Sequence, residues 1–431
     1  MVERTATDGV GEARGEPPVR GRDSMGVVHH STRFLRAARR PPTLYTREGD
    51  RHATWLELFF DLVYVVAVAE LGGLLHEDHS LTGFLGFAGL FVIVWWTWLG
   101  FSTYADQFDT DDIVHRVGMV AVMFGVIVLT GTIPSALHGG SFAFALAYLL
   151  LRTLYIGMYF RVWLNVPEYR QFSAFVIGST TLSASVWAVS LFFPEPTRFA
   201  IWGLSFVVSI VVTVRGYVGL ETIPRPTSHF SERLGLFTIL VLGETVLAVA
   251  VGTSGTDWAV GSALTAIAGF LIAVSFWWTY FRHVDEWFVD RMYRTNSGAW
   301  SREREVSFAH VIGHIVVFIG IITTGVGIAL AIEAAIESHT LEPSATAAVA
   351  GGVAIFLLGT SLVHRTTPEP PHDHVLAVRL TATALLVLMA FLAPEIVPLT
   401  LVGLVAVLLV GLNAFEGFRA YLQEQAVAME T

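Results

Sequence analysis

Residues 55–76 read WLELFFDLVYVVAVAELGGLLH, and this stretch decides the class of fold. It is mostly apolar over about 20 residues, the length that an α-helix needs to cross the hydrocarbon core of a bilayer. Asp61 lies inside it, between Phe60 and Leu62. A carboxylate at the middle of a membrane helix costs about 2.5–3.5 kcal/mol on insertion scales, so the sequence indicates a functional or pairing role for Asp61.

The composition of the chain extends this interpretation to its whole length. Of the 431 residues, 54% are hydrophobic and 14% are charged, whereas a soluble protein has about 25% charged residues. The apolar runs predict twelve membrane spans, at 55–76, 81–104, 113–134, 141–164, 171–193, 198–220, 232–253, 258–281, 306–333, 344–364, 374–393 and 398–422. In hydrocarbon the backbone groups must be satisfied within each segment. We therefore predict an all-α fold, a polytopic transmembrane helix bundle of about twelve helices.

The basic residues predict the orientation of the bundle. All 26 are Arg, and ten of them lie in residues 1–54, a polar stretch that we predict to be a disordered tail. The loops after every second span also carry Arg, and the alternate loops carry almost none. The positive-inside rule then predicts a multi-pass protein of the cell (plasma) membrane with both termini in the cytoplasm, residues 423–431 forming a short second tail.

The second half of the chain repeats features of the first half in the same order. The segment Asp61-LVYVVAV matches Glu244-TVLAVAV, and the Trp-Trp-Thr run at 95–97 recurs at 277–279. These matches predict two halves of six helices each, at 55–220 and 232–422. Because six is an even number, both halves face the same way, which is a parallel repeat with its axis along the membrane normal.

Two segments carry a resemblance to a known family. Trp55-LELFFDLVYVVAVAEL resembles the first-helix signature of the low temperature requirement A (LtrA) family of membrane proteins. Ser231-ERLGLFTILVLGETVLAVA resembles the family's second signature, Glu-Arg-x-Gly-Leu-(Phe/Tyr)-x-Ile-x-Leu-Gly-Glu, and the segment around His310 is similar to its third, histidine-bearing stretch. The resemblance covers residues 50–415. It implies a helical membrane protein required for growth in the cold, and it implies no particular molecular activity.

Four charged residues are candidates for an ion, proton or substrate pathway. Glu57 and Asp61 are separated by four positions and so lie on one face of their helix. Glu244 is about 15 Å along its helix from Leu234, at 1.5 Å per residue. Arg152 lies deep in its span and needs a counter-ion, for which Asp61, Glu57 and Glu244 are available. A static ion pair for Arg152, and plain hydration of Glu57 near the interface, are the structural alternatives.

His310 and His314 have a spacing that can place two imidazoles on one zinc ion. The residues between them supply no Glu and we find no third ligand, so we predict proton relay or hydrogen bonding within the bundle and no metal. Cysteine is absent, and no cofactor or nucleic-acid signature is present. The Trp pairs at 95–96 and 277–278 fall near the ends of their spans, which is typical of an interfacial aromatic belt.

Two classes of function fit these observations. The first is an ion- or proton-coupled transporter, in which Asp61 and Glu244 carry protons, cations or a small solute across the bilayer. The second is a protein without transport activity, either a scaffold or sensor that supports growth in the cold or a membrane-embedded enzyme acting on lipid. The enzyme would use a cytoplasmic cluster of polar groups: Glu57, Asp61, Arg282, His283, Asp285 and His310. We favour the transporter and leave the oligomeric state open.

Overall fold

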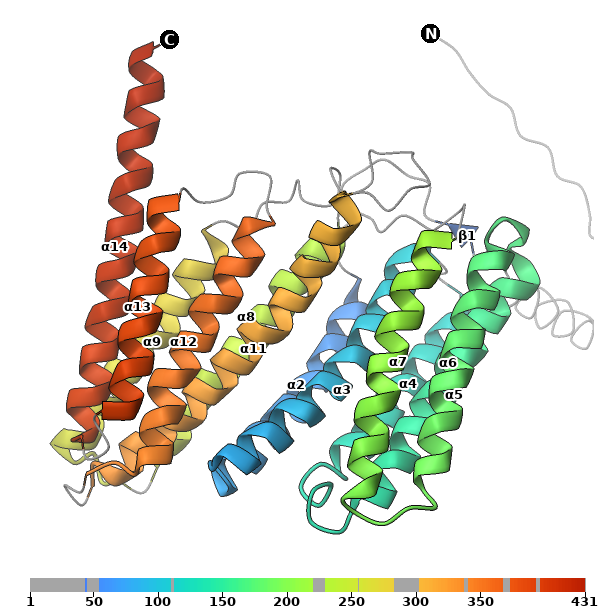
Figure 1. The fold of residues 1–431 in the computed structure, drawn as a ribbon, viewed down its shortest axis with the longest axis horizontal. Coiled ribbons are helices and arrows are strands. Elements are labelled where there is room, and N and C mark those ends of the chain that lie inside the picture. Colours follow the sequence, from blue (N-terminus) through green and yellow to red (C-terminus); the bar gives the residue numbers. More distant parts are fainter. Residues whose placement is uncertain are drawn as a thin grey trace, which may run out of the picture.

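The computed structural model describes residues 43–44, 54–109, 112–219, 229–254, 256–282, 302–336, 340–366, 373–392 and 396–430. Most of the predicted N-terminal tail, together with His283 and Asp285, lies outside the described residues. The described α-helices are α2 (Trp55–Glu77), α3 (Leu81–Gln107), α4 (Ile113–Thr130), α5 (Ser141–Asn165), α6 (Arg170–Ser190), α7 (Thr197–Gly219), α8 (His229–Thr253), α9 (Val260–Phe281), α11 (Arg302–Ala334), α12 (Pro343–Arg365), α13 (Asp373–Leu392) and α14 (Pro398–Glu430) (Figure 1).

The predicted all-α class is confirmed. Eleven of the described helices are long and apolar enough to cross a membrane, and α7 contributes a shorter apolar stretch at Thr197–Thr213. The other elements are one 3-10 turn, η1 (Pro167–Tyr169), and a two-residue antiparallel pairing of β1 (Thr43–Leu44) with β2 (Phe108–Asp109). The chain is therefore a multi-pass helical membrane protein whose spans contact the lipid bilayer.

Polar residues fix the start of several spans. Thr54 caps α2, because its side chain accepts from the backbone N–H of Glu57 at 3.3 Å while the Glu57 carboxylate accepts from the Thr54 N–H at 2.7 Å. This reciprocal capping satisfies backbone donors that a helix N-terminus otherwise leaves unpaired. Ser80 and Asp112 cap α3 and α4 by accepting from N–H groups three residues further on. Glu57 thus has a structural task at the end of α2.

The helices form two groups whose neighbours correspond. In the first group α2 packs on α3 and α4, and α4, α5, α6 and α7 follow as successive neighbours. In the second group α8 packs on α9 and α11, and α11, α12, α13 and α14 follow in the same way. Figure 1 shows the two groups side by side, with α2 and α11 where they meet. The correspondence is partial, because α9 also packs on α11 and α14 whereas α3 has no contact of comparable extent with α4 or α7, and the six-plus-six repeat stays a prediction.

Glycines let α11 and α12 approach closely. A Cβ added to Gly320 would lie 2.5 Å from the backbone N of Phe356, and one added to Gly327 would lie 2.6 Å from that of Val349. No side chain fits there unless the backbones move apart. Small residues at such contacts are the usual basis of tight helix packing in membranes, where burial in lipid gives no hydrophobic gain. The close approach of α11 and α12 therefore depends on glycine at these positions.

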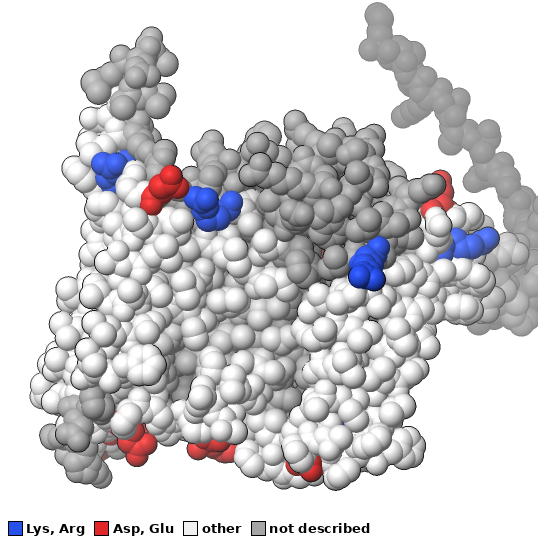
Figure 2. Space-filling view, viewed as in Figure 1, with Lys and Arg blue, Asp and Glu red and all other residues white. Residues whose placement is uncertain are grey.

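Charge is distributed unequally between the two ends of the bundle. Figure 2 shows basic side chains along one edge of this face and only acidic ones along the opposite edge, with an uncharged band between them. The uncharged band is what hydrocarbon requires of the outer surface. The charged groups inside the bundle are therefore the ones that need an explanation.

Candidate functional site

The two helix groups are joined by a buried ion pair. Arg233, in the first turns of α8, donates from Nη2 to Oδ1 of Asp61 on α2 at 2.7 Å, and both side chains are 1% exposed. Trp98 of α3 donates from Nε1 to the same oxygen at 2.8 Å. The Arg233 guanidinium also donates from Nη1 to the carbonyl of Ser102 at 3.2 Å. Three helices from both groups thus meet at one carboxylate.

The ion pair is not fully satisfied by the residues that surround it. Asp61 Oδ2, Arg233 Nε and the Ser102 hydroxyl are buried, and none of these atoms has a hydrogen-bond partner among the described residues. A buried polar atom without a partner costs about 1–3 kcal/mol. The pair also lies against aromatic faces, since the Arg233 guanidinium is 5.7 Å from the ring of Phe60 and 6.0 Å from that of Trp98. The unpartnered atoms add to the desolvation cost of burying the pair between the two groups.

An aromatic layer covers the ion pair on its inner side. Trp98 stacks on Phe237 of α8 with ring centroids 4.4 Å apart, and Phe237 contacts Phe318 of α11 at 5.2 Å. Phe91 of α3 contacts Phe318 at 6.4 Å. Phe237 lies between Arg233 and Glu244 in the sequence of α8, so the layer separates the ion pair from the deeper carboxylate.

Glu244 lies at the same interface as the ion pair but in different surroundings. Its Oε1 would be 3.2 Å from a Cβ placed on Gly72 of α2, and Ile322 of α11 lies at 3.8 Å from the same point. The side chain is partly buried between these three helices. Among the described residues, no side chain or backbone group forms a hydrogen bond or ion pair with the Glu244 carboxylate. The absence of a side chain at Gly72 gives this carboxylate its space.

The two contacts establish that α2 and α8 run parallel. Asp61 meets Arg233, and Gly72 meets Glu244, so the same step along each helix leads from one contact to the other. This step is about 16 Å long at a rise of 1.5 Å per residue. Asp61 and Glu244 occupy matching sequence contexts, but they do not face each other in the structure. The two acids lie in different layers of one interface.

The predicted pairing of Arg152 with a carboxylate is wrong. Arg152 of α5 donates from Nε to the hydroxyl of Tyr148 at 2.7 Å and from Nη2 to the same oxygen. Its guanidinium also lies over the Tyr148 ring, 4.7 Å from the centroid. Tyr148 precedes Arg152 by four positions and is reached within the same helix. Asp61, one of the three acids predicted to be available, is bound by Arg233 instead.

His310 and His314 belong to a hydrogen-bonded network that links three helices. His314 Nδ1 lies 2.8 Å from the backbone carbonyl of His310 and therefore carries a proton. Its Nε2 is then the acceptor for the hydroxyl of Tyr280 on α9, also at 2.8 Å. His310 Nδ1 lies 2.8 Å from the hydroxyl of Thr366 at the end of α12. Both imidazoles have fixed partners, and within the described residues no three His, Asp or Glu side chains are grouped to hold a metal ion.

A second buried ion pair lies in the outer part of the second group. Arg379 of α13 forms two hydrogen bonds to Glu416 of α14, from Nε at 2.6 Å and from Nη2 at 2.7 Å, and its Nη1 lies 2.8 Å from Nδ1 of His364 on α12. The Arg and Glu side chains are 0% and 2% exposed. This two-point geometry is the strongest that Arg and a carboxylate form. Sequence reasoning missed it, although both residues fall inside predicted spans.

The predicted aromatic belt at 95–96 and 277–278 is only partly present in the structure. Trp95 and Trp98 are fully buried in the core, whereas Trp277 and Trp278 of α9 are about half exposed on the outer surface. The prediction is therefore wrong for Trp95. Trp95 instead packs in the core against Trp98, with ring centroids 6.3 Å apart.

A bundle of apolar helices that encloses paired charges and the partly buried carboxylate of Glu244 defines a polytopic helical membrane protein. The family model described as "Bacterial low temperature requirement A protein (LtrA)" matches residues 52–413, and the chain belongs to this family. A curated relative from Rhizobium meliloti (strain 1021), "Uncharacterized protein RA0937", is 30% identical over 355 residues, which are 79% of this chain and 84% of the relative. No solved structure matches the chain. The predicted family is confirmed.

Proposed function

We propose that this LtrA protein is a proton- or cation-coupled transporter in which Glu244 is the carboxylate that binds and releases the ion. The observation that carries the proposal is the contact of Glu244 with Gly72, where a carboxylate lies between helices of both groups and no described side chain pairs with it. Ionisable side chains inside membrane helices are costly and usually serve ion or proton movement. A carboxylate without a fixed partner can exchange its ion without breaking a salt bridge.

In this proposal Asp61 has a different task from Glu244. Its Oδ1 accepts from both Arg233 and Trp98, so the carboxylate is already neutralised by a guanidinium 2.7 Å away. The positive charge of Arg233 would repel a metal cation from the same oxygen. Asp61 therefore holds α2 to α8. Of the two acids that the sequence predicts as carriers, we propose only Glu244 as the carrier.

The location of Glu244 supports transport over a purely surface role. Transporters built from repeats place substrate and ion sites near the middle of the membrane, at the interface between the halves. Glu244 lies at such an interface, about 16 Å along α8 from Arg233. We propose that the two helix groups are a parallel repeat in the cell membrane, with cytoplasmic termini as the Arg distribution predicts. In this proposal the two groups rock against each other around the level of Glu244.

A scaffold or sensor is the second candidate. It is favoured by the ion pairs Asp61–Arg233 and Arg379–Glu416, which are buried and join neighbouring helices. Such pairs hold helices together and carry nothing across the membrane. The lipid-acting enzyme relied on His283 and Asp285, and neither lies within the described residues. A transport measurement separates the first two candidates.

The experiment is a flux assay in liposomes. Purified protein is reconstituted, an inward gradient of pH or of Na⁺ or K⁺ is imposed, and internal pH or cation content is followed with a dye. We expect flux with the parent protein and its loss with Glu244→Gln, which keeps the shape of the side chain and removes its charge. Glu70→Gln is the matched control, since Glu70 is about half a turn around α2 from Asp61. Absence of flux from the parent would favour the scaffold, and unaltered flux in Glu244→Gln would contradict the role of Glu244.

A further inference from the structure

Arg152 of α5 is a buried cation to which the described residues supply no negative charge. Its side chain is 7% exposed and lies about 16 Å along α5 from Ser141, near the middle of the span. A guanidinium is not deprotonated in proteins, so Arg152 cannot lose its charge on burial. Arg233 and Arg379 are also buried in the bundle, and each binds a carboxylate. Arg152 binds only the neutral hydroxyl of Tyr148 among the described residues.

The acids that the sequence offers to Arg152 are engaged or placed elsewhere. Glu57 accepts a backbone N–H at the start of its own helix, and Asp61 accepts from Arg233. Glu244 belongs to α8, in the other helix group. A buried charge without a counter-charge is expensive in hydrocarbon. The charge of Arg152 therefore calls for an anion that is not part of the described chain.

The groups around Arg152 are those that an anion requires. Nε and Nη2 both donate to the Tyr148 oxygen, and Nη1 has no partner among the described residues. The Tyr148 oxygen already accepts from the guanidinium, so its own O–H proton is left to donate. The Tyr148 ring stacks on Trp187 of α6 with centroids 4.1 Å apart, and the charge of Arg152 also acts on Tyr64 of α2. One positive charge, N–H and O–H donors and aromatic walls thus lie together inside the first helix group.

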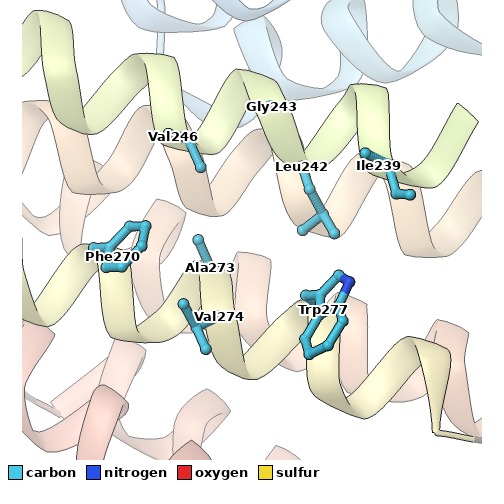
Figure 3. A pocket seen from close by; sticks show the side chains of 8 residues that line it. All are labelled: Ile239, Leu242, Gly243, Val246, Phe270, Ala273, Val274 and Trp277. Carbon is cyan, nitrogen blue, oxygen red and sulfur yellow. The ribbon is translucent and has the colours of Figure 1, made fainter. Parts of the chain in front are cut away.

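The apolar groove between α8 and α9 shows the contrast. Its lining residues carry no charge, and the indole nitrogen of Trp277 is the one polar side-chain atom among them (Figure 3). An anion that entered this groove would lose its hydration and gain no compensating charge. Anion binding is therefore expected at Arg152 and not at the groove.

We propose that Arg152 and Tyr148 form a binding site for one small monovalent anion in the first helix group. The guanidinium neutralises the anion through its free N–H groups, and charge-assisted hydrogen bonds of this kind are about twice as strong as neutral ones. One Arg balances one negative charge, so the site selects a monovalent anion such as nitrate or chloride over a divalent one. The aromatic walls favour anions that lose their hydration easily. The site does not rest on the proposed transport activity of Glu244, and the two proposals fail separately.

The test is the melting temperature of the full chain in detergent, measured while sodium nitrate or sodium chloride replaces sodium gluconate at constant ionic strength. We expect the melting temperature of the parent to rise and to saturate, since a ligand that binds only the folded state stabilises it. Arg152→Met should remove the saturable rise. Arg170→Met is the matched control and should keep it, because Arg170 also lies over a ring, 5.6 Å from that of Trp163, but is exposed. General effects of the salts on folding are common to all three proteins.

Three results would overturn the proposal: no saturable rise in the parent, an equal rise in Arg152→Met, or an equal loss of the rise in Arg170→Met. If Arg152→Met fails to fold, quenching of tryptophan fluorescence by iodide is measured in its place. Iodide bound at Arg152 lies beside Trp187, so the parent should show a saturable component of quenching that nitrate displaces and that Trp187→Phe removes. Quenching without a saturable component, or unchanged by Trp187→Phe, would contradict the anion site.

Discussion

Neutralising Asp61 should destabilise the fold far more than neutralising an exposed acid. Asp61 and Arg233 are both 1% exposed, and the guanidinium receives its compensating charge from Asp61. In Asp61→Asn the neutral side chain keeps the shape of the carboxylate and leaves a buried positive charge. Removing one partner of a buried ion pair costs about 3–5 kcal/mol, so we expect a loss of that size in the free energy of unfolding.

The assay is unfolding in mixed detergent micelles with increasing dodecyl sulfate, followed by tryptophan fluorescence and circular dichroism. Asp373→Asn is the matched control, because its ion pair with Arg365 has a distance of 3.2 Å but is exposed to solvent. An exposed pair contributes little to stability, and we expect the control to unfold with the parent. Asp61→Leu combined with Arg233→Met removes both charges and should recover most of the stability lost in either single variant.

The reasoning would be refuted by an Asp61→Asn variant as stable as the parent. It would also be refuted by a double variant that loses as much stability as the two single variants added together. The first result would mean that the carboxylate and the guanidinium are not coupled. The second would mean that the loss comes from altered packing of α2 and α8 and not from an uncompensated charge.

Three further predictions concern other parts of the fold. Glu416→Gln should lower the free energy of unfolding by about 3–5 kcal/mol in the same assay, because it leaves the buried charge of Arg379 without its counter-ion. Gly327→Ala should also destabilise, since its Cβ would lie 2.6 Å from a backbone nitrogen of α12, whereas Gly351→Ala, with nothing within 4 Å, should not; equal behaviour of the two variants would contradict the close approach of α11 and α12. Asp78 lies in the loop after α2, and hydrogen bonds from Ser80 lower the pKa of its carboxyl group. Ser80→Ala should therefore raise this pKa toward its ordinary value in an NMR titration. An unchanged pKa would show that the Ser80 side chain does not cause the shift.

The class of fold could be predicted from the sequence because hydrocarbon imposes one simple requirement on every span. A run of about 20 apolar residues has few alternatives to a transmembrane helix. The first predicted span, 55–76, and the seventh, 232–253, therefore agree closely with α2 and α8. The family also followed from the motifs in these two helices, and the match over residues 52–413 confirms it.

The partners of the charged residues could not be predicted in the same way. Arg233 is the second residue of the predicted span 232–253, where an Arg is expected to face the membrane surface, yet it lies buried beside α2. A helical projection contains part of the missing signal, because Arg233 and Glu244 are eleven residues apart and so lie on one face of α8. Which helix that face meets depends on tertiary packing, and a single sequence does not encode it in any local pattern.

The partner of Arg152 could not be predicted for a different reason. Its depth in the span correctly indicated that it needs a partner, but the candidates considered were all carboxylates on other helices. Tyr148, four positions earlier, offered a hydroxyl and an aromatic face on the same helix. Arg379 and Glu416 also lie inside predicted spans, and applying the same criterion of depth to them would have indicated the second buried pair.

The most direct test of the central claim is to observe the protonation of Glu244 itself. Infrared difference spectra of reconstituted protein, recorded between high and low pH, contain a C=O stretching band for each carboxylic acid that gains a proton inside the bundle. We predict one such band that disappears in Glu244→Gln, persists in Glu70→Gln, and weakens when the transported cation is added if protons and cations compete for the site. A spectrum in which Glu244→Gln leaves every carboxylic acid band unchanged would contradict the account.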